Sequence, residues 1–373
     1  MRVPGFSAAL LLAAALVAGA GGCARAVTPA ELARISLPPG FSISIYGEVP
    51  GARSMAWAPE ISTLFVGTRG DTLYAVRDRD GDERAETARV VGRGFNVPNG
   101  IAWHDGWLYV AEQNRVIRWR PMEDAPEPRD VQVLFDDLPD RSHHGWRYAT
   151  VGPDRRLYVA VGAPCNICAV SGLEGTIVRM NLDGSGVEIF ARGIRNSVGI
   201  DFRPNDGLLY FTDNGGDGLG NDVPPDEFNR ADRAGLHFGY PHYAGGRAVS
   251  PGWAGRTPPP GAVFPAVSFG AHVAALGVHF YRGGLFPVAY RNDAFVAQHG
   301  SWNRTVPDGY RVMRVRFDAA GRPLRAEPFA TGWLGANGAT WGRPVDVKEL
   351  PDGALLVSDD HAGVIYRIDY RIP

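Results

Sequence analysis

The chain has no excess of basic residues. Its 38 lysines and arginines are balanced by 40 aspartates and glutamates, and the formal net charge is −2, so the composition gives no sign of a nucleic-acid partner. Long stretches of helical periodicity are scarce beyond the N-terminus, whereas 48 glycines and 29 prolines supply many turns. With 45% hydrophobic residues, this is the composition of a turn-rich β protein with ample material for a core.

Cysteine is rare, with three in 373 residues. Cys165 and Cys168 form a C-x-x-C pair, and the sequence offers no two further ligands at the spacing of a zinc site. Ala169 follows the pair, where attachment of a c-type haem would need a histidine. We therefore expect a small disulfide that stiffens a loop.

The sequence also has no run of apolar residues that is long enough to span a bilayer comfortably. The apolar stretch from Ala8 to Ala20 is too short and follows the positively charged Arg2, as in a signal peptide. The sequence Ala-Gly-Gly-Cys that ends at Cys23 resembles a bacterial lipobox. It predicts an exported, periplasmic protein with a lipid anchor at Cys23. Cleavage without lipid, near residues 24–26, is the alternative.

These features divide the chain into three parts. Residues 1–23 are predicted to be a signal peptide with a lipobox, and residues 24–37 a short linker. Residues 38–373 are left as one catalytic domain, which is within the size range of a single large β domain.

Within this domain one pattern recurs about every 45–60 residues, with one wider gap. It consists of an alternating apolar strand, a turn and a second apolar strand. The copies are MAWAPEISTLFVG, IAWHDGWLYVA, ATVGPDRRLYVAVG, IDFRPNDGLLYFTD, the degenerate GVHFYRGGLFPVAYRNDAFVA, and VKELPDGALLVSD. Six units of several short strands predict an all-β, six-bladed β-propeller. A β-sandwich is the alternative, but it gives no reason for a repeat this long.

The ends of the repeat array predict how the ring closes. The stretch GFSISIYG precedes the first copy, and GVIYRIDY follows the last. We expect the N-terminal strand to join the last blade, because closure leaves only short, protected sheet edges.

Polar loops flank the repeated units at matching places. They carry histidines, arginines, indoles and a glycine-rich turn, and they span residues 142–147, 192–196, 212–217, 271–272, 298–304 and 341–346. Propeller loops converge on one axis, so these groups are expected to meet at one mouth. Histidine accepts protons near neutral pH and arginine binds carboxylates, a combination that suits an anionic, planar cofactor or substrate. Taken singly, each residue also has a structural interpretation, such as a hydrogen-bonded histidine or an inter-blade indole.

Several stretches resemble the soluble quinoprotein sugar dehydrogenases, and most of all their L-sorbosone dehydrogenase-like branch. They are HHGWRYATVGPDRRLYVAVGAPCNIC, GIRNSVGIDFRPNDGLLYFTDNGGDGLGNDVPPDEFNR, HFGYP, FVAQHGSWNRTVPDGYRV and GRPVDVKELPDGALLVSDDHAGVIYRI. The resemblance covers residues 38–372. It implies a six-bladed propeller that uses pyrroloquinoline quinone (PQQ) and calcium.

The resemblance also implies roles for particular residues. His144 matches the catalytic base, with His143 in support, and the carbonyls of Gly215 and Gly216 match calcium ligands. The implied cofactor contacts are Arg147, Arg195, Asn196, His272, Arg304 and Arg343. Two cationic positions of the glucose-oxidising members, an arginine and a lysine, fall on Val345 and Gly300. Arg304 and His299 are expected to supply the charge of the lysine at Gly300.

The implied function is a PQQ-dependent dehydrogenase that oxidises a sugar or an aldehyde-type substrate, aldose- or sorbosone-like. His144 would take the hydroxyl proton while hydride passes to the quinone. Because the sequence has no haem motif, electrons are expected to leave to a separate acceptor. Two alternatives stay open: a calcium-dependent lactonase, and a non-enzymatic propeller that binds a ligand or a partner.

One acidic loop stands apart from these groups. Residues 77–86, RDRDGDERAE, do not follow the order of an EF-hand, because glycine comes directly after the second aspartate. A structural calcium site and a plain solvated turn are both compatible with this stretch.

Overall fold

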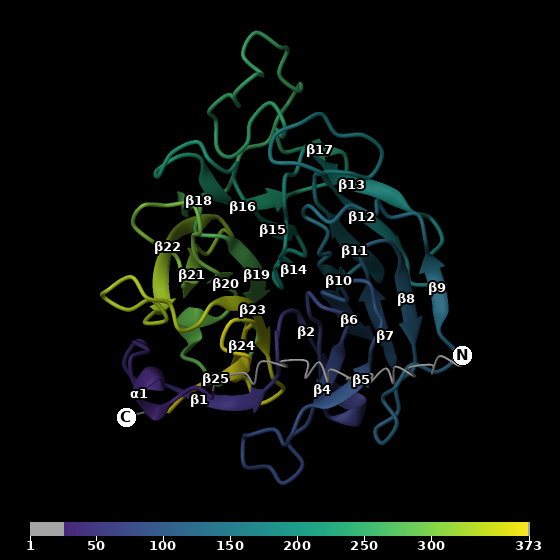
Figure 1. The fold of residues 1–373 in the computed structure, drawn as a ribbon, viewed down its shortest axis with the longest axis vertical. Coiled ribbons are helices and arrows are strands. Elements are labelled where there is room, and N and C mark those ends of the chain that lie inside the picture. The colour runs from purple at the N-terminus through teal and green to yellow at the C-terminus, as the bar shows by residue number, and fades with distance from the viewer. Residues whose placement is uncertain (1–25, 372–373) are drawn as a thin grey trace, which may run out of the picture.

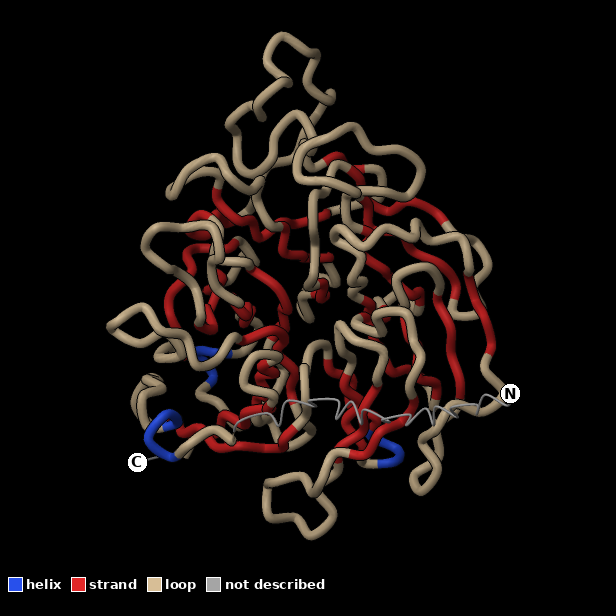
Figure 2. The backbone as a smooth tube through the Cα atoms, viewed as in Figure 1, coloured by secondary structure: helices blue, strands red, loops and turns tan. Residues whose placement is uncertain are grey.

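The computed structural model describes residues 26–371. Six sheets, antiparallel apart from one short added strand, stand around one central axis, as Figures 1 and 2 show. The predicted six-bladed propeller is thus confirmed. The predicted signal peptide, lipobox and lipid anchor at Cys23 lie outside the described residues.

The first three blades follow one another along the chain. The first contains β2 (Met55–Ala58), β3 (Thr63–Val66), β4 (Leu73–Val76) and β5 (Arg89–Gly92). The second contains β6 (Gly100–His104), β7 (Trp107–Ala111), β8 (Val116–Trp119) and β9 (Gln132–Phe135). The third contains β10 (Ala149–Val151), β11 (Arg156–Val161), β12 (Thr176–Asn181) and β13 (Glu188–Arg192), with the short β17 (Leu236–His237) added in parallel to β13.

The last three blades complete the ring. The fourth contains β14 (Ile200–Phe202), β15 (Leu209–Asp213), β16 (Pro225–Ala231) and β18 (Val267–Ala271). The fifth contains β19 (Ala275–Phe280), β20 (Ala294–Gln298), β21 (Arg311–Phe317) and β22 (Pro323–Ala330). The sixth contains β23 (Pro344–Glu349), β24 (Leu355–Asp359), β25 (Val364–Tyr370) and the N-terminal β1 (Phe41–Glu48). Helical turns are limited to α1 (Pro29–Leu32), η1 (Pro59–Ile61) and η2 (Val288–Tyr290) among the described residues.

Each copy of the sequence repeat forms the first two strands of a blade. In the second blade, His104 pairs with Trp107, so Asp105 and Gly106 alone make the turn. Both turn residues have left-handed φ angles, 48° and 78°, which match the twist of a two-residue hairpin. The second strand of each pair, such as β7, is buried on both faces by the neighbouring blades. This burial explains why these strands are nearly continuous runs of apolar residues.

Ring closure occurs as the sequence predicts. β1 pairs antiparallel with β25, from Phe41 opposite Tyr370 to Glu48 opposite Val364. The ring of Phe41 lies 4.7 Å from that of Phe286 and 5.1 Å from that of Phe329, centroid to centroid. The seam between the first and last strands is therefore packed with aromatic rings from the fifth blade.

The described part of the expected linker is not a loose connection. Thr28 and Glu31 form a capping box that begins α1, with hydrogen bonds of 3.2 and 3.0 Å. Leu32 and Ile35 pack against the same core as β1. Residues 26–37 thus belong to the propeller domain, because their apolar side chains find a surface to cover.

A long connection between β17 and β18 extends outward from the ring at the top of Figure 1. None of the helices among residues 26–371 is long and apolar enough to cross a membrane.

Candidate active site

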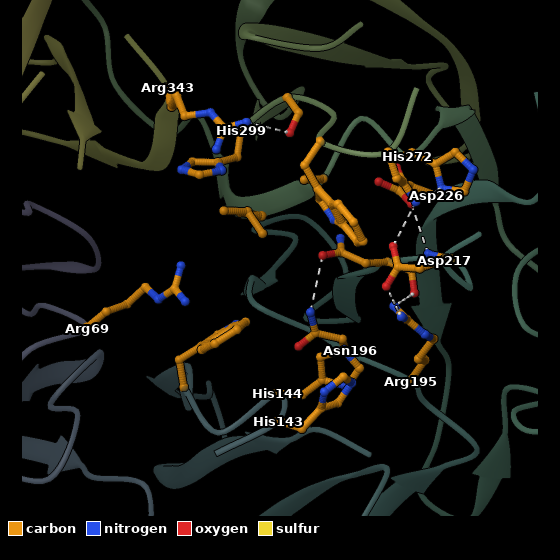
Figure 3. Close-up of a pocket in the computed structure, with 18 of the residues that line it drawn as sticks. Arg69, His143, His144, Arg195, Asn196, Asp217, Asp226, His272, His299 and Arg343 are labelled. Atoms are coloured by element: carbon orange, nitrogen blue, oxygen red, sulfur yellow. Dashed lines mark hydrogen bonds and ion pairs between the residues drawn. The ribbon is translucent and has the colours of Figure 1, made fainter. Parts of the chain in front are cut away.

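Loops of several blades surround a cavity of about 580 Å³. Its ionisable and amide-bearing lining residues include Arg53, Arg69, His143, His144, Arg195, Asn196, Asn214, Asp217, Asp226, His272, His299, Asn303 and Arg343. Figure 3 shows His143 and His144 on one wall, Arg195 and Asp217 beside them, and Arg69 and Arg343 across the cavity. Residues from nearly the whole length of the chain thus meet at one place, as predicted for loops of a closed ring.

His144 occupies the loop before β10. Its ring Nδ1 lies 2.9 Å from the carbonyl oxygen of Ala163, so Nδ1 carries the hydrogen and Nε2 keeps its lone pair. Burial, followed by the nearby charges of Arg195 and His143, lowers the pKa of His144 to about 2. The imidazole is therefore neutral at physiological pH and able to accept a proton.

The backbone around His144 is closely fitted. Its φ of 52° lies in the left-handed region, which few residues other than glycine and asparagine adopt readily. Gly162 packs against it, and a Cβ at position 162 would stand only 2.5 Å from the Cβ of His144. This glycine allows the end of β11 to approach the histidine.

Asp213 holds the Arg195–Asn196 pair in place. Its carboxylate accepts hydrogen bonds from the backbone N–H groups of Arg195 at 2.9 Å and Asn196 at 2.6 Å. Burial raises the pKa of Asp213 to about 7. The Oδ1 atom of Asn196 is buried and accepts no hydrogen bond from any described residue, so this amide has an unused acceptor beside the cavity.

The guanidinium of Arg195 is fixed from two directions. It forms an ion pair with Asp217 at 2.6 Å, and it donates to the carbonyl and side-chain oxygens of Asn166 at 3.0 and 2.9 Å. Asn166 lies inside the predicted disulfide, which joins Cys165 and Cys168 in the structure. The disulfide loop is thereby connected to the cavity wall.

Gly215 and Gly216 follow β15 in the glycine-rich loop. Asp226 accepts the N–H of Gly215 at 2.9 Å, and Ala244 accepts the N–H of Gly216 at 2.6 Å. No described residue donates a hydrogen bond to either glycine carbonyl. Only Gly215 of the two lines the cavity, next to Asp217 and Asp226. Free carbonyls beside carboxylates form a set of oxygen donors that suits calcium.

The opposite wall contains a linked series of charged groups. His299 contacts Asp360 at 2.7 Å through Nε2, and the other oxygen of Asp360 contacts Arg53 at 2.6 Å. Burial lowers the pKa of His299. The hydrogen bond of His299 and the positive charge of Arg53 hold the pKa of Asp360 well below its usual range despite burial. Arg343, just before β23, lies close by and has no carboxylate partner among the described residues.

Two predicted cofactor residues do not reach the cavity. The guanidinium of Arg147 is buried and donates to the carbonyls of Gln113, Pro139 and His144 at 2.9, 2.6 and 3.2 Å. Arg304 instead donates to backbone carbonyls of neighbouring loops, including that of Val306 at 3.1 Å. Both arginines hold loops together, because several main-chain oxygens converge on each guanidinium.

The surroundings of His272, Gly300 and Val345 show what each of these positions can accommodate. His272 lines the cavity, and its Nε2 contacts the carbonyls of Gly220 and Val223 at 2.8 and 3.1 Å. Gly300 has a φ of 97°, and a Cβ there would stand 2.4 Å from the ring of Tyr310, so a lysine does not fit. Val345 is buried in a small apolar cluster against which Trp146 packs.

Several lining residues lie outside the six predicted loops. Arg53, Arg69 and Asp226 all border the cavity. Arg69 comes directly after the first copy of the repeat, the place that the glycine-rich loop occupies after the fourth copy. Arg69 could therefore have been found by comparing the residues that follow each copy of the repeat.

A cluster of three metal-binding side chains occurs at one place among residues 26–371. Asp78, Asp80 and Asp82 bring one carboxylate oxygen each within 4.8 Å of the others, on the acidic loop outside the cavity. Among the described residues, the cavity contains no cluster of three such side chains.

Comparison with known proteins places the chain in a family. The family model described as glucose/sorbosone dehydrogenase matches residues 52–367. An uncharacterised protein of Borreliella burgdorferi is 32% identical over 352 residues, which cover 90% of this chain and 91% of that protein.

Solved structures share the fold. A calcium structure of a Trichoderma reesei family AA12 carbohydrate-active enzyme has a TM-score of 0.79 at 19% identity and covers 90% of this chain and 97% of its own. The holo PQQ domain of Coprinopsis cinerea pyranose dehydrogenase has a TM-score of 0.74 at 21% identity, with the same coverage. The family match over most of its length shows that the chain belongs to the glucose/sorbosone dehydrogenase family.

Proposed function

We propose that this protein is a PQQ-dependent dehydrogenase that oxidises a sugar or a sorbosone-like aldehyde. One observation carries the proposal: a neutral histidine with a free Nε2 faces the same cavity as Arg195, Asn196 and the free carbonyl of Gly215. A general base, a cationic cofactor contact and an oxygen donor for calcium are thus combined in one site.

The residues of the cavity fit PQQ and calcium. PQQ is a planar, anionic quinone, and the cavity is lined by the positively charged Arg195 and Arg343 and by the amide-bearing Asn196. The carbonyls of Gly215 and Gly216 accept no hydrogen bond from the described residues, so they are available to a hard cation. We infer that these residues hold the two groups.

PQQ, when bound, supplies the two-electron oxidant that accepts hydride from the substrate carbon. His144 takes the proton of the substrate hydroxyl on Nε2, since Nδ1 is committed to the Ala163 carbonyl. An anionic ligand over Arg195 offsets the positive charge that lowers the pKa of His144, and this makes the histidine a stronger base in the loaded site.

The proposal is tested by reconstitution. Purified protein is titrated with PQQ in the presence of calcium, and an aldose is then added while the absorption spectrum is recorded. Reduction of the bound quinone supports the dehydrogenase. Tight binding without reduction by any aldose or aldehyde would favour a ligand-binding propeller instead.

We also propose that the protein is exported, anchored by lipid at Cys23 and coupled to a separate electron acceptor. Support comes from the sequence of residues 1–23 and from the lack of a haem motif. Labelling with a radioactive fatty acid in a bacterial host, with Cys23→Ala as the control, tests the anchor. Labelling of both variants or of neither would contradict it.

A further inference from the structure

Arg69 is an exposed arginine at the cavity with no carboxylate partner among residues 26–371. Its guanidinium carbon lies 4.1 Å from the centroid of a Trp146 ring, in range of a cation–π contact. Trp146 is in turn supported by the buried cluster of Val198, Leu276 and Val345. Stacking on a supported indole orients the guanidinium without neutralising its charge.

The neighbours of Arg69 make this wall positive. Partial burial of the side chain, and after it the charges of Arg53 and Arg343, lower the pKa of Arg69, while Asp360 raises it. Asp360 is already shared by Arg53 and His299. Two guanidiniums, those of Arg69 and Arg343, are therefore left uncompensated on one side of the cavity.

The two walls of the cavity differ in whether their arginine is paired with a carboxylate. On the wall near the glycine-rich loop, Arg195 is buried and paired with Asp217 at 2.6 Å. Arg69 lies across the cavity from that pair in Figure 3 and is exposed to solvent. An incoming substrate would therefore meet Arg69 before it reached the buried wall.

We propose that Arg69 binds a carboxylate of the substrate, so that the preferred substrates are sugar acids such as hexuronates. This inference rests on the proposed dehydrogenase function. A guanidinium donates two parallel hydrogen bonds to a carboxylate, and the indole beneath fixes the plane of the fork.

The reaction at the other end of such a substrate is balanced. The anomeric carbon of a hexuronate loses hydride to the quinone, and its hydroxyl loses a proton to His144. The product is a lactone that still carries the carboxylate, and the quinone receives two electrons.

The test compares D-glucuronate with D-glucose, which differ only in a carboxylate or a hydroxymethyl group at C6. Binding of each sugar to the protein loaded with PQQ and calcium is measured by calorimetry, and turnover is measured in parallel. We expect wild-type protein to bind glucuronate at least tenfold more tightly than glucose. Arg69→Gln should lose that preference, and Arg69→Lys should retain part of it.

Arg120→Gln is the matched control. Arg120 is also exposed and stacks on an indole, with its guanidinium carbon 4.5 Å from a Trp107 ring centroid, but it does not line the cavity. This variant should keep the wild-type preference. Equal affinity of wild-type protein for the two sugars would overturn the inference.

The affinity for PQQ shows whether Arg69 binds a carboxylate of the substrate or one of the cofactor. If Arg69→Gln weakens PQQ binding tenfold and leaves the ratio of sugar affinities unchanged, Arg69 contacts the cofactor and the inference is wrong. If glucuronate binds through Arg69 but no sugar is oxidised, the carboxylate subsite stands and the proposed dehydrogenase function fails.

Discussion

The side-chain oxygen of Asn166 accepts a hydrogen bond of 2.9 Å from the guanidinium of Arg195. The Asn166 carbonyl accepts a second, at 3.0 Å, from the same side chain. Since Cys165 and Cys168 are bonded on either side of Asn166, the small disulfide restrains the residue that orients the proposed cofactor arginine.

Opening this disulfide should weaken PQQ binding. The double variant Cys165→Ser, Cys168→Ser frees the Asn166 loop, and the loss of about 1 kcal/mol of hydrogen bonding corresponds to a roughly fivefold higher Kd. Fluorescence titration with PQQ measures it, and Asn166→Ala should give a similar value. Wild-type affinity in the double variant, or free thiols in natively exported protein, would contradict this role.

Replacement of His144 should abolish turnover and leave the fold intact. Asparagine is the most suitable substitute, because it tolerates the φ of 52° and offers a donor to the Ala163 carbonyl. We expect His144→Asn to lower kcat by about 10²–10⁴-fold at saturating PQQ. His143→Asn, checked in the same assay, should have a much smaller effect. The reverse order would show that His143 is the base.

The same histidine predicts how stability depends on pH. Its pKa of about 2 in the folded protein lies below the ordinary value of 6.5, so the unfolded chain binds a proton first as pH falls. His144 therefore contributes stability above pH 6.5 that is lost below it, by about 1.4 kcal/mol per pH unit. Urea unfolding between pH 7.5 and 5 should show this extra slope in wild-type protein relative to His144→Asn. Equal slopes would mean that the imidazole is protonated in the fold.

The closure of the ring should be sensitive to Phe41. Its ring contacts those of Phe286, Phe329 and Tyr370 at centroid distances of 4.7, 5.1 and 4.9 Å. Phe41→Ala should lower the free energy of unfolding by about 3 kcal/mol, the low end for this substitution because the side chain is half-buried. Ser42→Ala, on the exposed face of β1, is the control. Equal stability of the two variants would contradict a packed seam.

The architecture could be predicted from the sequence because each copy of the repeat corresponds to one blade. Each blade begins with two buried strands, and this pair survives even in the degenerate copy, where a longer connection with η2 joins β19 and β20. The pairing of β1 with β25 followed from the position of the two leftover strands.

The orientation of loop side chains could not be predicted in this way. Arg147 is three residues from His144, yet the carbonyls of Gln113 and Pro139 draw its guanidinium away from the cavity. For Arg69, the repeat indicates a place near the mouth but not a partner, because the Trp146 ring on which it stacks comes from a distant loop. Such contacts are set by neighbouring blades and not by local pattern.

We propose above all that the cavity binds PQQ and that a sugar is oxidised there with His144 as the base. The most direct test is rapid mixing of the protein, loaded with PQQ and calcium, with D-glucuronate or D-glucose, while quinone absorption is followed. We predict reduction of the quinone within a single turnover in wild-type protein, and reduction slowed by at least about 100-fold in His144→Asn with PQQ still bound. Equal rates in the two proteins, or a bound quinone that no sugar reduces, would contradict the claim.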